Sequence, residues 1–431
     1  MNEKKKKLGF KLILFSLLFI PGMQVLFIVG CNSKYLIRLP LFIAIIVLNI
    51  LFIVQLIIGL KIFIDNKDAS KRKLRKWLKV VFSIFMSIYV VGCTVLIVLL
   101  YSPYAKFRTW LITTAMATMD HQYYCQIFFN DEQINSILSQ NYILESGEST
   151  NTELINQDSN EPVVYNEYER EIMMHEEGEP YKIVTFEVNG ATAYLAAIYD
   201  PSKVELAVTQ KIGVIGEYVT HMAERTGAIM AINAGGFIDA GNNLGESPTG
   251  ITIVDKQIIT NNEYGTATST GGIIGMTDDN VLVLLKNTTA EQAIEMGVRD
   301  AVSWGPFLIV NGVPSQVSGN GGWGGGARSA IGQRKDGTIL FLVVESNSIR
   351  TTGAGMEDLV EIMQRYGAYN AANLDGGTSS VLAVPRDVAK SKYNASCHDY
   401  FTNYACPIND PIDATGTHQT RYVADAWIVM P

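Results

Sequence analysis

The sequence predicts an α+β domain with mixed, largely antiparallel β-sheets, preceded by three transmembrane α-helices. Three observations support this class. The first 101 residues hold three long apolar segments, the residues after 166 hold many short β-branched runs, and charge divides unevenly between these regions. With 431 residues, of which 48% are hydrophobic, the chain exceeds one typical domain, so we expect separate regions.

The predicted membrane region is residues 1–101. Its apolar segments cover residues 8–29, 36–60 and 78–101, and none of them holds an acidic residue. A helix needs about 20 residues to cross a hydrocarbon core about 30 Å thick, and each segment has that length. Because none has the polar face of a surface helix, we expect all three to be transmembrane helices.

Charge predicts the orientation of these helices. The first 110 residues hold 17 of the 34 Lys and Arg residues but only 3 of the 42 Asp and Glu residues. The basic side chains gather before the first segment and at residues 61–79, between the second and the third. Cytoplasmic loops carry such an excess. We therefore expect a multi-pass protein of the cell membrane, with a cytoplasmic N-terminus, an extracellular C-terminal domain and the lipid bilayer as a partner.

Two alternatives concern this region. The basic loop at 61–79 has the composition of a nucleic-acid or acidic-lipid patch. Its position between two spans favours a topology signal instead, and no nucleic-acid partner. The stretch "FIVGC" ending at Cys31 resembles a bacterial lipoprotein cleavage site. Its apolar run is longer than a signal-peptide core and two more spans follow, which favours a membrane helix.

Two connecting segments follow. Residues 102–143 place Ile127, Ile134 and Leu138 at helical spacing, which predicts one amphipathic stalk helix. Residues 144–165 are polar and acidic, and predict a flexible linker with little secondary structure. Such a linker would let the last domain move away from the bilayer.

Residues 166–431 form the predicted α+β domain. Short apolar runs rich in β-branched residues recur between Gly, Asn, Asp and Pro, as strands do. The clearest are "KIVTFEVNG", "ATAYLAAIYD", "KVELAVT", "AIMAINAGG", "GITIVDKQIIT", "VLVLLK", "FLIVNG", "TILFLVVES" and "DAWIVM". Helices are predicted at 215–226 and 356–366, the second ending at Gly367. This alternation is too sparse for a doubly wound sheet, which favours antiparallel sheets.

The cysteines predict a disulfide in this domain. Cys397 and Cys406 enclose a short loop in the predicted extracellular region, where disulfides persist. A metal site with His398 is the alternative, but no Cys-x-x-Cys or spaced His pair accompanies it. We therefore predict no metal and no cofactor. The acids that offer a calcium site without a supporting motif are Asp239, Asp278 and Asp279.

Four stretches share one pattern, in which a β-rich run delivers a polar residue onto a glycine-rich turn. They are "INAGGF", "GGWGGGARSAIG", "VVESNSIR" and "NLDGGTSS", and their polar residues are Asn233, Arg328, Glu345 and Asp375. Glycine lets a ligand approach the backbone closely, and a turn exposes the residue that a strand holds. Each stretch alone is also a common turn or strand end. Together they predict one binding site.

Five motifs occur in order between Val184 and the C-terminus: "NAGGF", "GPFLIVNG", "ARSAIGQRKDG", "NLDGGTSS" and "TRYVADAWIV". In this order they resemble the phosphodiester glycosidase family, which contains the uncovering enzyme and bacterial proteins of exopolysaccharide biosynthesis. The resemblance implies hydrolysis of a sugar-1-phosphodiester at the anomeric C–O bond. This sequence departs from the family pattern at Gly236 and Thr378, which replace a frequent aromatic residue and a third glycine.

The resemblance and the chemistry together imply the roles of the site residues. Asp375 would act as base or nucleophile with Glu345 as its partner, because glycosidases usually use two carboxylates. A phosphate monoester leaves readily without much protonation, so one strong carboxylate and a cation would also suffice. Arg328 would hold the phosphate in a bidentate fork, assisted by Arg421. Asn233 would hydrogen-bond a sugar hydroxyl or the attacking water.

The remaining predicted binding groups supply hydrogen bonds and a stacking surface. Glycine-turn amides bind phosphate or sugar oxygens, and hydroxyl groups after Asp375 keep its carboxylate ionised. An indole stacks on a sugar face. These residues are Gly235, Gly236, Phe237, Ser329, Gly376, Gly377, Thr378, Ser379, Ser380 and either Trp304 or Trp323.

The sequence thus predicts a membrane-anchored extracellular hydrolase that cleaves a phosphate-linked cell-wall or exopolysaccharide glycan. One alternative is a protein that binds such an anionic glycan without cutting it. Another is a scaffold for polysaccharide assembly partners. Metal-assisted hydrolysis at phosphorus ranks low, because it needs clustered ligands and the histidines are scattered: His121, His175, His221, His398 and His418.

Overall fold

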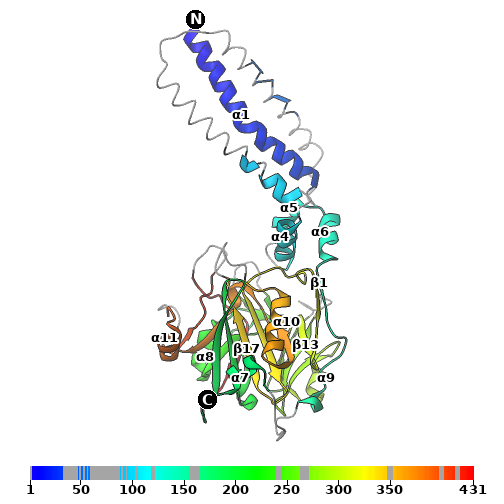
Figure 1. Cartoon of the computed structure of the whole chain (residues 1–431), viewed down its shortest axis with the longest axis vertical. Helices are drawn as coiled ribbons and strands as arrows, with labels where there is room; N and C mark the ends of the chain where they lie inside the picture. The colour runs from blue at the N-terminus through cyan, green and yellow to red at the C-terminus, as the bar shows by residue number, and fades with distance from the viewer. Residues whose placement is uncertain are drawn as a thin grey trace. The chain divides into compact units, whose positions relative to one another are not determined.

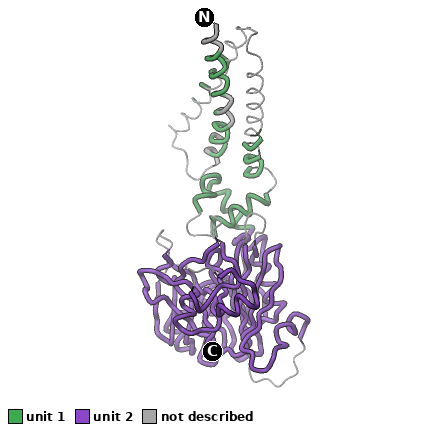
Figure 2. The backbone as a smooth tube through the Cα atoms, turned by 90° about the vertical axis from the view of Figure 1, so that its left-hand side faces the viewer, with its two compact units in different colours: residues 1–140 green, residues 141–431 purple. Residues whose placement is uncertain are grey.

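The computed structural model divides the chain into two compact units, residues 1–140 and 141–431 (Figure 2). Each unit is described by itself. The described residues are 2–32, 105–117, 122–155, 165–238, 244–262, 271–346, 353–397, 402–412 and 418–431, with isolated positions between 47 and 101.

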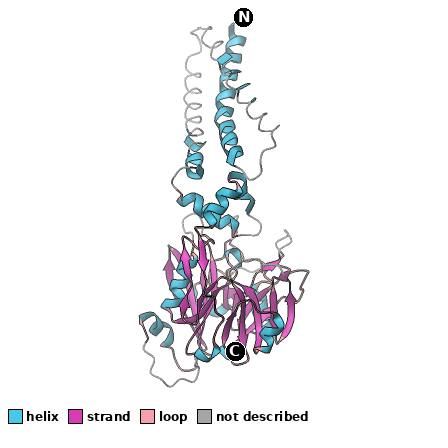
Figure 3. Ribbon diagram, turned by 90° about the vertical axis from the view of Figure 1, so that its right-hand side faces the viewer, coloured by secondary structure: helices cyan, strands magenta, loops and turns pink. Residues whose placement is uncertain are grey.

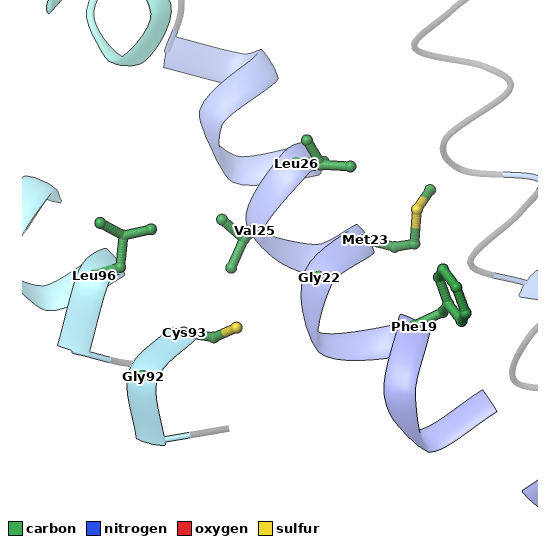
Figure 4. Close-up of a pocket in the computed structure, with 8 residues that line it drawn as sticks. All are labelled: Phe19, Gly22, Met23, Val25, Leu26, Gly92, Cys93 and Leu96. Carbon is green, nitrogen blue, oxygen red and sulfur yellow. The ribbon is translucent and has the colours of Figure 1, made fainter. Parts of the chain in front are cut away.

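The first unit begins with helix α1 (Asn2–Asn32), which contains the first predicted span. The other two predicted spans, 36–60 and 78–101, lie largely outside the described residues. An apolar pocket of about 600 Å³ is lined by α1 and by Gly92, Cys93 and Leu96 (Figure 4). Among the helices described, none alone has the length and apolar composition to cross a membrane. Two helices joined by a bend of 73°, Val91–Tyr101 and Lys106–Met116, meet both requirements together.

Residues 102–143 were predicted to form one stalk helix, but they do not form a single continuous helix. The structure has three helices there, α4 (Lys106–Met116), α5 (Gln122–Phe128) and α6 (Asp131–Leu138). Asn130 starts α6 afresh, because its side chain accepts a hydrogen bond from the Gln133 amide while the Gln133 side chain accepts one from the Asn130 amide. Ile134 is buried in a small core, whereas Ile127 is 39% exposed.

The second unit is built on three antiparallel sheets (Figures 1 and 3). The central sheet runs in the order β14 (Val313–Pro314), β13 (Phe307–Val310), β18 (Ala368–Asn373), β16 (Arg328–Arg334), β17 (Ile339–Val344), β3 (Ala191–Ile198), β2 (Tyr181–Val188). A second sheet runs β11 (Leu282–Leu285), β10 (Gly272–Thr277), β12 (Val298–Trp304), β8 (Ile251–Val254), β9 (Gln257–Asn261). The third runs β20 (Ala405–Pro407), β19 (Leu382–Pro385), β5 (Met230–Asn233), β21 (Asp425–Val429), β4 (Val204–Val208).

Short elements complete the unit. Two-stranded pairs join β1 (Tyr142–Leu144) to β15 (Gln316–Ser318) and β6 (Phe237–Ile238) to β7 (Ser247–Pro248). The helices are α7 (Glu167–Met173), α8 (Val219–Thr226), α9 (Ala290–Glu295), α10 (Met356–Arg365) and α11 (Arg386–Tyr393). Single turns of 3₁₀-helix lie at Thr152–Leu154, Pro201–Lys203 and Gly377–Ser379. The expected α+β architecture with largely antiparallel sheets is confirmed.

The layers follow from which face each strand buries. One face of the central sheet, with Ile331 and Phe341 fully buried, packs against residues of both five-stranded sheets. Its other face packs against α10. Helix α8 packs on the outer face of the third sheet and α9 on that of the second. Because each of these three sheets is covered on both faces, strands such as β16, β17 and β21 are buried along their whole length, whereas the edge strands β2 and β9 keep exposed positions.

The two predicted helices of this domain agree with α10 and, in part, with α8. Gly367 follows α10 with a φ of 79°, the left-handed conformation that glycine adopts at a helix end. Helix α8 begins only at Val219, four residues later than predicted. The residues before it form isolated bridges instead, with Ile215 paired to Lys211 and Glu217 to Val423.

The predicted linker, 144–165, differs from the structure in its first part. Residues 141–155 are packed into the second unit, and residues 156–164 lie outside the described residues. The Glu145 carboxylate is buried, accepts hydrogen bonds from the amides of Gly271 and Phe307, both at 2.7 Å, and pairs with Lys286. The Thr150 hydroxyl accepts from the Leu284 amide at 2.9 Å. Specific contacts thus order a segment whose composition predicts disorder.

Candidate active site

Two strand ends from different sheets meet where the chain leaves β18. Leu374 still pairs with β16, because its amide donates to the Ser329 carbonyl at 2.8 Å. The next amide, that of Asp375, donates instead to the Ala234 carbonyl just beyond β5, at 3.0 Å. The chain therefore crosses from the central sheet to the third sheet at Asp375. This crossing brings together three of the four predicted motifs, those of Asn233, Arg328 and Asp375.

Asn233 fixes this crossing and has no free polar atom for a ligand. It is fully buried, and its Nδ2 donates to the Asp375 carbonyl at 2.7 Å. Its Oδ1 accepts from the Ser329 hydroxyl at 2.7 Å and from the Val381 amide at 3.2 Å. Asn233 and Ser329 thus use these polar atoms within the protein, whereas the sequence predicted contacts of these residues with sugar or water. Both residues position the Asp375 turn.

Asp375 itself is partly exposed, so its carboxylate can reach a ligand. Burial raises the pKa of this carboxyl group above its ordinary value. A hydrogen bond from the Ser379 side chain opposes that rise most strongly, followed by the positive charge of Arg421. The Gly376 amide and the Arg328 guanidinium act in the same direction. The expected support from a hydroxyl group is present at Ser379, whereas the Ser380 hydroxyl is buried without a hydrogen-bond partner among the described residues.

Arg328 is buried under the same turn and is oriented by backbone carbonyl groups. Its Nη2 donates to Trp323 at 2.7 Å and Gly324 at 3.0 Å, and its Nε donates to Ala354 at 3.3 Å. Burial lowers its pKa to about 10, and the nearby Asp375 opposes that shift. Because Nε and Nη2 are already engaged, the predicted bidentate fork on a phosphate is not available. Arg328 contributes a fixed positive charge.

Gly376 makes the close approach of this guanidinium to the turn feasible. A Cβ atom at this position would lie 2.9 Å from the Ala327 carbonyl oxygen and 3.2 Å from Nη1 of Arg328. Gly377 has a φ of 65°, and its amide donates to the same Ala327 carbonyl at 2.8 Å. The Gly377 amide is therefore not free for a ligand, contrary to prediction.

Arg421 is the more accessible cation of the site. Its guanidinium lies 4.7 Å from the ring centre of Phe237, which is buried and acts as a platform. The residue is partly exposed, and its charge lowers the pKa of Asp375. The predicted binding residue Phe237 thus acts through Arg421.

The first motif contributes shape rather than amides. The Gly235 amide donates to Asp425 at 2.7 Å, so it is not free for phosphate as predicted. At Gly236, a Cβ atom would lie 1.9 Å from the Trp304 ring. Trp304 therefore fills the space that a side chain at this position would need. Its ring meets the ring of Trp323 edge-on at 6.5 Å, and both indoles are partly exposed beside the site.

Glu345 lies elsewhere, and its prediction as the partner of Asp375 is not supported by the geometry. It lines a pocket of about 220 Å³ with Tyr194 and His418. Its Oε1 accepts from the Asp410 amide at 2.6 Å, and its charge contributes to raising the pKa of Tyr194, after burial. Arg328 pairs with Val344 across β16 and β17, so the following residue, Glu345, points to the opposite face.

One acidic residue of the site was missed. Asp425, at the start of β21, is 1% exposed, and its Oδ1 accepts the Gly235 amide. Its Oδ2 is buried without a hydrogen-bond partner among the described residues. Burial raises the pKa of Asp425 to about 7, and the neighbouring charge of Asp375 adds to the rise. A lone acid inside the apolar run "VADAWIV" is the signal that would have found it.

Other predictions concern disulfides and metals. The predicted bond between Cys397 and Cys406 is confirmed, with a Cα–Cα distance of 5.6 Å. Within the described ranges, no three His, Cys, Asp or Glu side chains gather as a metal site would require. Of the acids named for calcium, Asp278 pairs with Lys256 at 2.5 Å, and Asp239 lies outside the described residues.

Comparison with known proteins shows similarity to one family over the region that contains this site. Residues 226–430 match the family model described as phosphodiester glycosidase. An uncharacterized SPbeta prophage-derived protein of Bacillus subtilis (strain 168) is 30% identical over 175 residues, which are 39% of this chain and 26% of that protein. The match thus spans about a quarter of the length of that relative.

Solved structures with detectable similarity include two further proteins. The catalytic domain of zebrafish N-acetylglucosamine-1-phosphodiester α-N-acetylglucosaminidase, auto-inhibited by its pro-peptide, is 17% identical, with a TM-score of 0.44 over 60% of this chain and 85% of that one. A putative exported protein of Burkholderia pseudomallei is 18% identical, with a TM-score of 0.36 over 56% and 74%. The motifs at Asn233, Arg328, Asp375 and Arg421 all fall inside residues 226–430, the region that matches the phosphodiester glycosidase family model.

Proposed function

We propose that this domain hydrolyses a sugar-1-phosphodiester at the anomeric C–O bond. One observation carries the proposal. A partly exposed carboxylate, Asp375, lies within the electrostatic reach of two guanidinium groups, Arg328 and Arg421, inside a phosphodiester glycosidase domain. A phosphodiester carries one negative charge beside the anomeric carbon that reacts. In this arrangement the cations can stabilise the phosphate charge, and the carboxylate can act at the anomeric carbon.

The proposed reaction uses Asp375 as base or nucleophile. As a base, it accepts a proton from water while the oxygen of that water bonds to the anomeric carbon. The bond from that carbon to the phosphate oxygen breaks, and its electron pair leaves with the phosphate. A phosphate monoester with a second pKa near 6 needs little protonation to leave. Arg421 stabilises the charge that develops on it, and the fixed charge of Arg328 assists.

The indole rings supply the sugar side of the proposed site. Trp304 and Trp323 are partly exposed and meet edge-on, so they form an apolar wall beside Gly236. Sugar faces carry C–H groups that pack on aromatic rings. We place the sugar against this wall and the phosphate near Arg421, with the anomeric carbon facing Asp375.

The setting of the enzyme is also proposed rather than observed. The basic N-terminal region, the long apolar segments and the disulfide between Cys397 and Cys406 fit a membrane-anchored protein whose C-terminal domain lies outside the cell. The substrates that such a location offers are phosphate-linked glycans of the cell wall or of exopolysaccharides. A protein that binds or scaffolds such glycans without cleaving them is the competing candidate.

The test is an assay of the full-length protein with a panel of sugar-1-phosphodiesters, measuring reducing sugar released. Asp375→Asn should abolish turnover while calorimetry still detects ligand binding. Asp410 is an exposed acid that lines the pocket of Glu345, so Asp410→Asn is the matched control and should keep turnover. If the wild-type protein binds members of the panel but releases no sugar, the domain is a binder and the proposed activity is wrong.

A further inference from the structure

The proposed reaction leaves one acidic group of the site without a role. Asp425 lies on β21, between β5 and β4 in the third sheet, and is 1% exposed. It cannot touch a substrate from there. Its side chain accepts a hydrogen bond at Oδ1 from the Gly235 amide, inside the first site motif. Its Oδ2 is buried and has no partner among the described residues.

Among the described residues, no cation pairs with the Asp425 carboxyl group. Asp425 faces Val208 on β4, and on the side of β5 it contacts the backbone amides of Ala234 and Gly235, which are uncharged. The ionisable group that acts on it is Asp375, whose charge opposes its ionisation. The guanidinium groups of Arg328 and Arg421 act on Asp375 instead. An isolated carboxylate without a cation or a second hydrogen bond is strongly disfavoured at such a place.

We propose that Asp425 is a protonated positioning residue, whose neutral carboxyl group holds the first motif through Gly235 and keeps the site net positive, so that the site binds an anionic phosphodiester more tightly while that proton is present. The ligand class rests on the proposed function. The protonation of Asp425 does not, because it follows from burial and contacts alone.

The net charge of the site determines how strongly it attracts an anion. With Asp425 neutral, two guanidinium groups face one carboxylate, so the site carries a net positive charge. When the proton of Asp425 is lost to solvent, two adjacent carboxylates balance the two cations. The positive charge that attracts an anion is then gone, and the two acids titrate as a coupled pair. Affinity for an anion should therefore fall as Asp425 ionises, near pH 7.

The raised pKa of Asp425 also makes the stability of the fold depend on pH. The folded-state pKa of Asp425, about 7, lies above the ordinary aspartate value of 3.8, so the folded protein holds this proton more tightly than the unfolded chain. Its contribution to stability is full below the unfolded pKa and is lost as pH rises through the folded pKa. Asp425→Asn mimics the protonated form, accepts the same hydrogen bond and should remove this dependence.

Two further variants serve as comparisons for Asp425→Asn. Asp300→Asn is the matched control, because Asp300 is also buried and has a raised pKa, but it pairs with Arg299 in the second sheet. Asp425→Ala removes the acceptor for Gly235 and tests whether the hydrogen bond itself matters. All measurements use the full-length protein.

The first measurement needs no substrate. Infrared difference spectra between about pH 5.5 and about pH 8.5 should show the carbonyl band of a protonated carboxyl group disappearing in the wild type. Asp425→Asn should lack the part of that change that Asp425 contributes, whereas Asp300→Asn should retain that part. The melting temperature should fall less over the same range in Asp425→Asn than in the wild type. An Asp425→Asn spectrum identical to that of the wild type would show that Asp425 is already ionised, and would overturn the inference.

The second measurement concerns the ligand. A methyl diester of a sugar 1-phosphate is suitable, because it does not itself titrate in this range. Its affinity for the wild type should fall at least about fivefold between about pH 6 and about pH 8.5, and stay nearly constant for Asp425→Asn. Parallel pH profiles for both proteins would contradict the charge argument. If the infrared change is present but no sugar phosphodiester binds, the proposed function fails and the protonated Asp425 stands.

Discussion

Replacing Glu145 should unfold the second unit at a markedly lower denaturant concentration, although its position lies in a segment whose composition predicts a linker. The side chain of Glu145 is 1% exposed, and one oxygen accepts both the Gly271 and Phe307 amides. Its other oxygen pairs with Lys286. Glu145→Ala would leave two amides and an ammonium group without their partner.

The magnitude follows from these contacts. Breaking a buried ion pair by removing one partner lowers the free energy of unfolding by about 3–5 kcal/mol. Each hydrogen bond to a charged group contributes about 1.5–3 kcal/mol, and the effects overlap at one carboxylate. We therefore expect Glu145→Ala to destabilise by about 4 kcal/mol and Glu145→Gln, which keeps an acceptor, by about 2 kcal/mol.

The assay is equilibrium unfolding in urea, followed by fluorescence. Glu148→Ala is the matched control, because Glu148 is exposed in the same segment and should change the free energy of unfolding by less than about 0.5 kcal/mol. Limited proteolysis should cut near residue 150 in Glu145→Ala sooner than in the wild type. A Glu145→Ala protein within about 1 kcal/mol of the wild type would refute the packing of residues 141–155 into this unit.

The remaining predictions concern the proposed site. Arg421→Ala should raise KM for a sugar-1-phosphodiester about tenfold and lower kcat/KM at least as much, because the accessible cation is lost; an unchanged KM in initial-rate measurements would remove Arg421 from the phosphate position. Gly236→Ala should push Trp304 from its place, since the new Cβ would lie 1.9 Å from the ring, and should destabilise by about 1–3 kcal/mol. Near-ultraviolet circular dichroism and the melting temperature would show this. Gly147→Ala, with no heavy atom within 4 Å of the new Cβ, is the control, and equal melting temperatures for the two variants would contradict the packing at Gly236.

The site was predictable from sequence to the extent that its residues stand at strand ends beside glycine. Asn233, Arg328 and Asp375 each follow that pattern, and the structure brings them together. The pattern carries no information on which way a side chain points. Asn233 and Arg328 use their polar atoms on the backbone of neighbouring turns, so they position the site rather than bind in it.

Glu345 shows why the same pattern also misleads. It stands at a strand end like the others, but side chains alternate between the two faces of a strand. Val344 pairs with Arg328, so the residue after it points away from Arg328. A shift of one residue in the strand therefore decides whether an acid reaches this site. Pairing partners are long-range contacts, which the local sequence does not specify.

Composition was reliable for the strands and unreliable for the connecting segments. The apolar runs of the domain are buried on both faces, and strands buried in this way have nearly continuous apolar sequences. The segment at 141–155 is ordered by few contacts, chiefly those of Glu145 and Thr150 with distant backbone groups. Polar residues that satisfy buried amides look, in the sequence alone, like residues that prefer water.

The structure also gives a physical reading of the departure at Gly236. The indole of Trp304 occupies the space where a side chain at this position would lie. The aromatic surface of the site thus comes from the end of β12 rather than from the first motif, and it meets Trp323 at 6.5 Å. Trp304 packs against Gly236, in the same motif as Asn233, and Asn233 donates a hydrogen bond to the Asp375 carbonyl. We infer that the sugar accepted by this domain is selected by the position of Trp304, and that the anionic group is selected by Arg421 and the proton of Asp425.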